Sequence, residues 1–117
     1  MEKIQISDVF NCNRTLSKLF KSQNEFPISV GFKLFKITKL FDEVEEYVFS
    51  IMSMTFDDFS FDKMTHEQIE FFNLILNERI ELEYDKISIK SFENSCNLKL
   101  SMDEIQNLRI ILKENDE

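Results

Sequence analysis

A run of apolar residues at helical spacing constrains the fold of this chain more than any other feature. Seven of them follow one another at alternating intervals of four and three: Val30, Leu34, Ile37, Phe41, Val44, Val48 and Ile51. This spacing is a heptad seam over three repeats, so all seven lie on one side of an α-helix. Leu40, Tyr47 and Met54 widen the apolar stripe. A widened stripe favours a helix packed in a globular layer over a bare two-stranded coiled coil.

We expect one long helix over residues 27–54, with Pro27 at its first position. Such a helix would be about 42 Å long at about 1.5 Å per residue. A compact domain of 117 residues has a radius of gyration of only about 13–14 Å. The helix must therefore span the whole molecule, break near residues 52–55, or project into a partner.

The N-terminal residues predict two smaller elements before this helix. Residues 3–6 alternate apolar and polar side chains and suit a short strand or an extended arm. Ser7 or Asp8 can cap a helix that runs to about Gln23. Residues 22–25 form a polar break before the long helix.

The C-terminal half predicts a capped helix and then two extended stretches. Thr65-x-x-Gln68 is a capping box, and an apolar face follows it at helical spacing: Ile69, Phe72, Ile75 and Leu76. Ile80, Leu82 and Tyr84 alternate with acidic residues, and Ile87 and Ile89 alternate with Ser and Lys. This alternation predicts two extended stretches around Asp85 and Lys86. A loop over residues 92–97 follows, and Leu98 and Leu100 are expected to be extended.

A second capping box, Ser101-x-x-Glu104, opens the last helix, and its inward residues are expected to be Ile105, Leu108, Ile111 and Leu112. We expect the acidic tail after it to fray. The predicted fold is a single α+β, helix-dominated domain over residues 1–117. It consists of an antiparallel helical hairpin, a small β element and a C-terminal helix.

Composition excludes several classes of protein. A hydrophobic content of 43% is too high for a disordered chain, and no apolar stretch approaches the about eighteen residues of a membrane helix. A signal-peptide pattern is absent, so we expect a cytoplasmic protein. A single Gly rules out glycine-rich phosphate loops. Cys12 and Cys96 are expected to be free, half-buried thiols.

Charge is polarised along the chain. Residues 1–41 carry a net charge of +4, residues 42–85 carry −11 from thirteen acidic and two basic side chains, and residues 86–117 carry −1. Such a map creates a field that can steer a partner with a basic surface. The alternative is a solvated surface that keeps a Phe-rich protein soluble.

Two candidate contact surfaces lie in the acidic block. The spacing of Asp42, Glu45 and Glu46 places them on one exposed face of the long helix. The loop over residues 55–64 alternates acidic and aromatic residues, and its candidates for partner binding are Asp57, Asp58, Phe59, Phe61 and Asp62. Its rings either anchor a partner as hot spots or fold back as a cap over the helix hairpin.

We expect no metal site and no cofactor. Calcium loops of the EF-hand type alternate oxygen ligands and need Gly at a sharp turn, whereas Phe59 and Phe61 interrupt the acids of this loop and Gly is absent from it. Direct nucleic-acid binding is not expected either. Lys33, Lys36 and Lys39 could meet phosphates, but the whole chain has a net charge of −8.

Catalysis is not expected. Nucleophilic catalysis needs a nucleophile, a base and an orienting group, and the only histidine, His66, is expected to be exposed at a helix start. Paired carboxylates work as acid and base when an apolar pocket raises the pKa of one of them. The carboxylates of this chain are expected on a polar helix face and in a loop, where water solvates them.

Three segments carry a resemblance to a known group of proteins. They are FPISVGFKLFKITKLFDEVEEY, IELEYDKISI and the last-helix motif LxxSMDEIxxL. Together they resemble short phage proteins of low-GC Gram-positive bacteria, an origin that also suits the abundance of Phe, Ile, Asn and Lys. The resemblance implies a phage origin and a non-enzymatic role in the cytoplasm of an infected bacterium.

Two functional hypotheses follow. The first is an acidic inhibitor or modulator that occupies a basic surface on a host nucleic-acid-handling or defence enzyme. The second is a phage assembly or structural component that forms a homo-oligomer through its long helix. Salt-sensitive binding to one host protein distinguishes the first, and self-association distinguishes the second.

Overall fold

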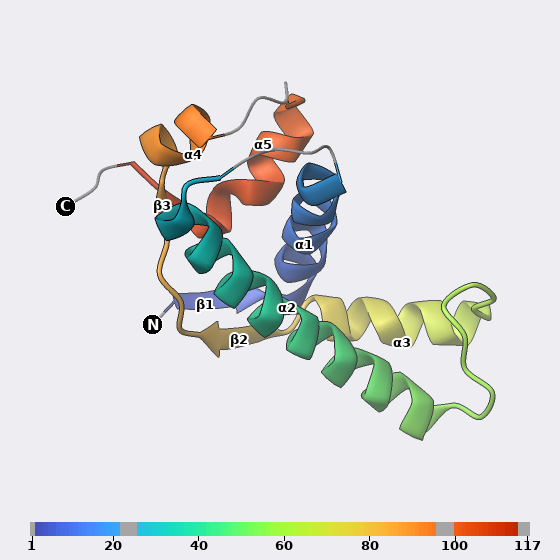
Figure 1. Ribbon diagram of the computed structural model, residues 1–117. Coiled ribbons are helices and arrows are strands. Elements are labelled where there is room, and N and C mark those ends of the chain that lie inside the picture. Colours follow the sequence, from blue (N-terminus) through green and yellow to red (C-terminus); the bar gives the residue numbers. More distant parts are fainter. Residues whose placement is uncertain (1, 22–25, 96–99, 115–117) are drawn as a thin grey trace.

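The structure, a computed structural model, describes residues 2–21, 26–95 and 100–114. Its elements follow in the order β1 (Glu2–Gln5), α1 (Ile6–Lys21), α2 (Ile28–Thr55), α3 (His66–Leu76), β2 (Arg79–Leu82), β3 (Ile87–Ser88), α4 (Ile89–Ser95), α5 (Met102–Leu108), the 3₁₀ helix η1 (Arg109–Ile111) and β4 (Leu112–Lys113). Helices dominate, with small strands between them (Figure 1). The predicted helix-dominated α+β class is confirmed.

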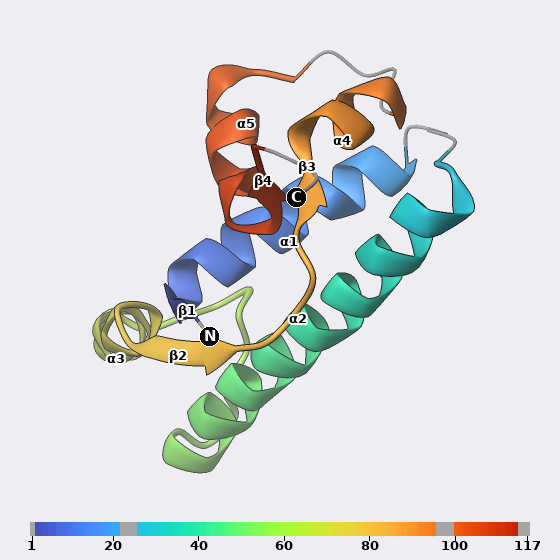
Figure 2. The same cartoon turned by 90° about the vertical axis from the view of Figure 1, so that its left-hand side faces the viewer.

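The long helix α2 spans the molecule without a break. Its 28 residues measure about 42 Å at 1.5 Å per residue, close to the 45 Å of the longest molecular dimension. Figure 2 shows it running along one edge of the molecule. Pro27 directly precedes the first residue, and the Gly31 amide donates a 2.8 Å hydrogen bond to the Pro27 carbonyl.

The heptad seam is the inner face of α2, as predicted. The buried residues of this face are Val30, Leu34, Ile37, Phe41, Val44, Val48 and Met52. The last buried residue is Met52 rather than the expected Ile51, which is half-buried. An α-helix has 3.6 residues per turn, so a strict 3.5-residue pattern drifts around it by about 20° per heptad.

The predicted widening of the inner stripe is wrong for Tyr47 and Met54. Both side chains are exposed, and only Leu40 packs half-buried against the core. Each of the two exposed residues lies about 100° around the helix from the seam, which carries it towards the outer face of α2.

The inner face of the N-terminal half of α2 packs into an aliphatic body formed with α1, α5 and η1. The fully buried residues that α1, α5 and η1 contribute are Val9, Cys12, Leu16, Leu19, Leu108 and Ile111. Tyr84 closes this body, because its ring meets the Phe41 ring edge-on with centroids 5.5 Å apart and its hydroxyl donates to the Ile110 carbonyl at 2.6 Å.

The strands form two separate two-stranded sheets. β1 pairs antiparallel with β2, with Ile4 opposite Ile80, which confirms the expected N-terminal strand. β3 pairs in parallel with β4 instead of continuing from β2. β2 is therefore joined to the N-terminal strand and β3 to the C-terminal strand, and β2 and β3 do not pair with each other.

The helical hairpin is an arm made of residues 42–76, hereafter the acidic arm. The C-terminal half of α2 leads through the loop of residues 56–65 into α3, which runs back beside it (Figure 1). Thr65 caps α3 as predicted: its hydroxyl accepts from the Gln68 amide, and the Gln68 side chain accepts from the Thr65 amide.

One residue of the predicted face of α3 is wrong. Ile69, expected to be buried, is 43% exposed, whereas Gln68, whose side chain accepts from the Thr65 amide, is buried. Ile75 is buried as predicted, and Phe72 and Leu76 are half-buried against the core.

The expected extended chain at Ile89 and the loop from residue 92 are wrong, because α4 occupies Ile89–Ser95. The Ser88 hydroxyl accepts a 3.1 Å hydrogen bond from the Ser91 amide, a helix-starting contact of the N-cap type. Phe92 is buried as a result. Residues 96 and 97 of the expected loop, and Leu98, lie outside the described residues.

The last helix follows its capping box as predicted, with Ser101 and Glu104 exchanging both bonds. Leu108 and Ile111 are buried and Leu112 is half-buried, but Ile105, expected inward, is 46% exposed. The predicted polar break at residues 22–25 and the tail from residue 115 lie outside the described residues.

Candidate protein-binding surface

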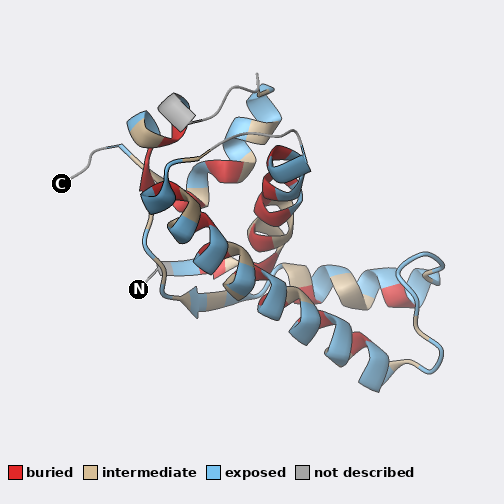
Figure 3. Ribbon diagram, viewed as in Figure 1, coloured by how far each residue is buried: buried red, intermediate tan, exposed pale blue. Residues whose placement is uncertain are grey.

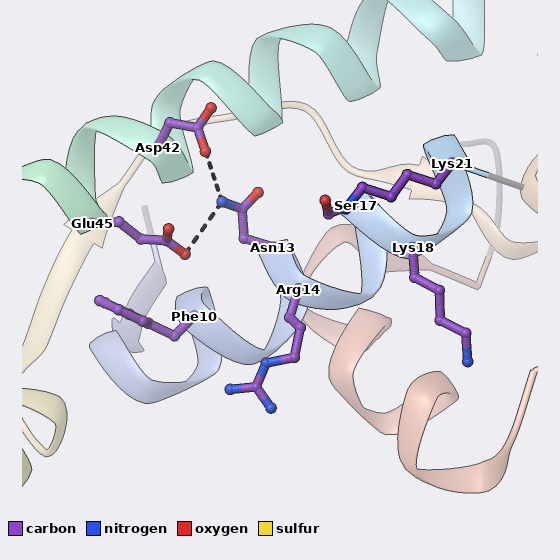
Figure 4. A pocket seen from close by; sticks show the side chains of 8 residues that line it. All are labelled: Phe10, Asn13, Arg14, Ser17, Lys18, Lys21, Asp42 and Glu45. Carbon is purple, nitrogen blue, oxygen red and sulfur yellow. Dashed lines mark hydrogen bonds between the residues drawn. The ribbon is translucent and has the colours of Figure 1, made fainter. Parts of the chain in front are cut away.

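Asp42, Glu45 and Glu46 do not form one outward face. Asp42 and Glu46 are exposed, whereas Glu45 is half-buried against α1. The buried Asn13 of α1 donates to the Asp42 carboxylate at 2.7 Å and to the Glu45 carboxylate at 3.2 Å (Figure 4). Two of the three predicted contact residues therefore hold α1 and α2 together.

The environment of Glu45 opposes its charge. Burial raises the pKa of the Glu45 carboxyl above its ordinary value of 4.5, and the nearby Asp42 charge acts in the same direction. The hydrogen bond from Asn13 and the charge of Arg14 oppose this shift of the pKa but do not cancel it. Asn13 thus compensates a carboxylate whose position is set by helix packing.

The same residues line an open groove of about 670 Å³ between α1 and α2. Its α1 wall carries Arg14, Lys18 and Lys21, and its α2 wall carries Asp42 and Glu45. In Figure 4 the Arg14 and Lys18 side chains point away from α2.

Lys18 instead forms a 2.6 Å ion pair with Glu104 of α5, and this hydrogen bond is the main cause of a lowered pKa at Glu104. The groove therefore presents mixed charge rather than a purely acidic surface. Along this groove the basic N-terminal block of the sequence, residues 1–41, packs against the acidic block, residues 42–85.

The end of the acidic arm differs, because its carboxylates are all exposed. The acidic tip, as we name it, consists of Asp57, Asp58, Asp62, Glu67 and Glu70. Two basic residues, Lys63 and His66, lie among them in the sequence.

Two local backbone features shape the tip loop. Asp58 takes a positive φ of 55°, and the Asp62 amide donates to the Ser60 hydroxyl at 3.3 Å. Asp and Asn are among the residues that adopt a positive φ most readily. In the described part of the chain, no three His, Cys, Asp or Glu side chains come together as a metal site.

The rings of the loop fold back over the helical hairpin, which is one of the two alternatives expected from the sequence. Phe59 and Phe61 stack edge-on with centroids 4.7 Å apart, and both contact Phe49 of α2. Phe61 also meets Phe72 of α3 at 5.4 Å, and Phe72 meets Phe10 of α1 at 5.9 Å. Phe61 remains 41% exposed, so part of its ring is available at the arm's surface.

His66 and Cys12 occupy contrasting positions. His66 is exposed at the start of α3, with its Nε2 atom 3.0 Å from a Glu70 carboxylate oxygen. Burial raises the pKa of the Cys12 thiol to about 12, and the charge of Asp8 adds to this effect. Cys12 is therefore a protonated core residue near neutral pH, and Cys96 lies outside the described residues.

Sequence reasoning missed a second apolar stripe, on the outer face of α2. Its members are Ile28, Phe32, Phe35, Tyr47 and Met54, each between 61% and 87% exposed. The signal was the spacing of Ile28, Phe32 and Phe35, which repeats the intervals of four and three out of phase with the seam. The lysines predicted as possible phosphate contacts lie beside this stripe, with the Lys36 ammonium 5.9 Å from the centroid of the Phe32 ring.

None of the helices in the described residues is long and apolar enough to cross a membrane. Comparison of the chain with protein-family models, with curated proteins and with solved structures finds no match. The acidic tip and the outer face of α2 are thus the two surfaces from which a function can be argued, and the resemblance to phage proteins stays a prediction.

Proposed function

We propose that this chain is a non-catalytic protein-binding protein whose acidic tip docks on a basic surface of another protein. The observation that carries the proposal is the contrast between two groups of carboxylates. Asp42 and Glu45 are held by Asn13 beside the cations of α1. The acidic tip is exposed throughout and lies at the loop and first turns of α3.

A cluster of exposed carboxylates acts over a distance. Like charges that gather on one part of a protein create a field that accelerates encounter with an oppositely charged partner. Salt screens this field, with a Debye length of about 10 Å at 0.1 M. Binding through the acidic tip should therefore weaken steeply as ionic strength rises.

A basic groove that binds phosphates is the partner surface that best complements such a tip. Proteins that handle nucleic acid build these grooves from Lys and Arg. We therefore place the chain among acidic inhibitors or modulators of a nucleic-acid-handling or defence enzyme, acting in the cytoplasm of a phage-infected bacterium. The phage setting rests on the resemblance alone.

The experiment compares three baits in affinity capture from bacterial lysate. The tip variant changes Asp57, Asp58 and Asp62 to Asn, which keeps side-chain shape and suits the positive φ at position 58. The matched control changes three exposed acids outside the arm: Glu93→Gln, Asp103→Asn and Glu114→Gln. Both variants have the same net charge.

We expect one host protein to be captured by the wild type and by the control, less by the tip variant, and less by every bait at high salt. Inhibition of the purified host protein's nucleic-acid binding should follow the same order. Equal losses in both variants would show that net charge alone matters. Equal capture by all three baits would remove the tip from the account.

The assembly hypothesis, in which the chain oligomerises through α2, needs a different contact surface from the one expected. The seam expected to form that contact is buried in the chain's own core. The outer face of α2, however, is apolar and uncovered.

A further inference from the structure

The outer face of α2 presents large apolar side chains that the rest of the described chain leaves exposed. Its five apolar residues are at least 61% exposed, whereas Leu34, Ile37 and Phe41 on the inner face are at most 1% exposed. Figure 3 shows exposed residues following α2 across the front of the molecule. Large apolar patches on soluble proteins usually mark an interaction surface.

The charged residues on this face have a definite order. From the N-terminus, Ile28, Phe32 and Phe35 come first, then two lysines, then two glutamates, and then Tyr47 and Met54. The charged residues are Lys36, Lys39, Glu43 and Glu46, and all four are exposed. None of the four forms an ion pair with another residue in the described part of the chain.

This order is complementary to its own reverse. When two copies of α2 lie antiparallel with a two-fold axis opposite Phe41, Lys39 faces Glu43 of the second copy, and Lys36 faces its Glu46. The same register sets Phe35 against Tyr47 and Ile28 against Met54. Every large apolar residue of the stripe then has an apolar neighbour, except Phe32, which meets Ser50.

We propose that two copies of this chain associate antiparallel through the outer faces of α2. An interface with a two-fold axis uses the same patch on both partners, which is what this face offers. The side chains of Phe32, Phe35 and Tyr47 are 61–66% exposed, so covering each would bury about two thirds of the about 150–250 Å² of an aromatic side chain. Six such rings would supply about 600–950 Å², a large part of the about 1,200–2,000 Å² that a specific interface buries.

The inference goes beyond the proposed function and does not depend on it. Glu43 and Glu46 would be covered in the dimer, whereas the acidic tip lies past the end of α2. Because the helices run in opposite directions, the two tips would lie at opposite ends of the contact. The dimer would then present two acidic tips to its partners.

The first test measures mass in solution by sedimentation equilibrium over a range of concentrations. The wild type should be a dimer, and the Phe32→Ser, Phe35→Ser double variant should have a Kd raised about tenfold or more. The matched control removes two exposed apolar side chains elsewhere, Leu74→Ser and Met102→Ser, and should leave the Kd unchanged. Circular dichroism should show all three proteins folded, since every replaced residue is exposed.

The second test reverses charges at the two-fold axis. Lys39→Glu or Glu43→Lys alone sets like charges against each other and should dissociate the dimer, whereas the double reversal should restore it. Lys90→Glu, an exposed charge on α4, is the control and should have no effect.

Three results would overturn the inference. A wild type that stays monomeric at every concentration would leave the face to a different protein. A dimer that is indifferent to the changes at Phe32 and Phe35 would place the contact elsewhere. Failure of the double reversal to restore a dimer that the single reversals had dissociated would refute the antiparallel register.

Discussion

The inner and outer faces of α2 both carry large apolar residues, but only the inner face carries them along the whole helix. The inner face is aliphatic apart from Phe41 and Met52, and the chain covers it almost completely. The outer face is mostly aromatic and uncovered, and charged residues separate its two apolar ends.

The difference shows what apolar periodicity can and cannot predict. Spacing of four and three identifies an apolar face but not whether the chain covers it: this fold buries the inner face of α2 and leaves the outer face exposed. Charges decide between the two faces. The inner face has none, because an unpaired charge there would be costly, whereas the outer face tolerates Lys39 and Glu43 in water.

The largest predicted effect compares one substitution on the two faces. Phe41→Asp places an unpaired carboxylate in the core and should cost several kcal/mol, most of a small domain's stability. Phe35→Asp should change the free energy of unfolding by at most about 0.5 kcal/mol. Chemical denaturation of dilute protein, where self-association contributes little, checks both. A free energy of unfolding equal to that of the wild type for the Phe41 variant would refute the assignment of the inner face.

The aromatic packing inside the acidic arm should contribute less to the free energy of unfolding than the packing of the aliphatic body. Phe72→Ala removes contacts with Phe10 and Phe61 from a half-buried position. We expect a loss of about 1–3 kcal/mol, below the range of a fully buried Phe. Hydrogen exchange should accelerate in α3 more than in α1 or α5. Uniform acceleration across all helices would show that the arm and the body unfold as one unit.

The cap of α3 should contribute less. Thr65→Ala removes the acceptor for the Gln68 amide and should cost about 1 kcal/mol. Ser101→Ala removes the equivalent acceptor from α5 in the body. Similar losses in thermal denaturation are expected, because the two caps have the same chemistry. A negligible loss at either site would mean that tertiary packing alone fixes that helix start.

Glu45, at the border between the faces, gives the smallest effect and a pH dependence. Its pKa is raised above 4.5 in the folded protein, so the folded state retains a proton that the unfolded state has already lost. Its contribution to stability is therefore present below pH 4.5 and is lost as pH rises through the raised pKa.

Glu45→Gln should consequently be more stable than the wild type at pH 7, by a few tenths of a kcal/mol because water screens this half-exposed group. The gain should vanish below pH 4.5. Glu104, whose lowered pKa acts in the opposite direction, is common to both proteins and cancels in the difference. A gain that is constant with pH would assign the effect to packing.

Most of the fold could be predicted from the sequence where signals were long or chemically specific. The seam gave α2, and two capping boxes gave the starts of α3 and α5. The error at α4 arose from a short alternating stretch in which Ser88 can continue a strand or cap a helix. The partners of the strands depend on packing between distant segments, which alternation does not encode.

The candidate site could be predicted only in part. The acidic block is read directly from composition, but its division between the groove and the tip depends on Asn13, a residue that carries no charge. The orientation of Glu45 towards α1 and of Glu46 towards solvent follows from how the helices cross. The outer stripe was present in the sequence and was obscured by the stronger seam beside it.

The central claim is that the inner face of α2 holds the chain together and leaves the outer face for a second copy. Its most direct test is an equimolar mixture of the Lys39→Glu and Glu43→Lys proteins, examined by sedimentation equilibrium. In the mixed pair, two carboxylates of one chain face two ammonium groups of the other across the axis. We predict that each variant alone is monomeric and that the mixture forms a one-to-one dimer. A mixture that associates no more tightly than its components would contradict the claim.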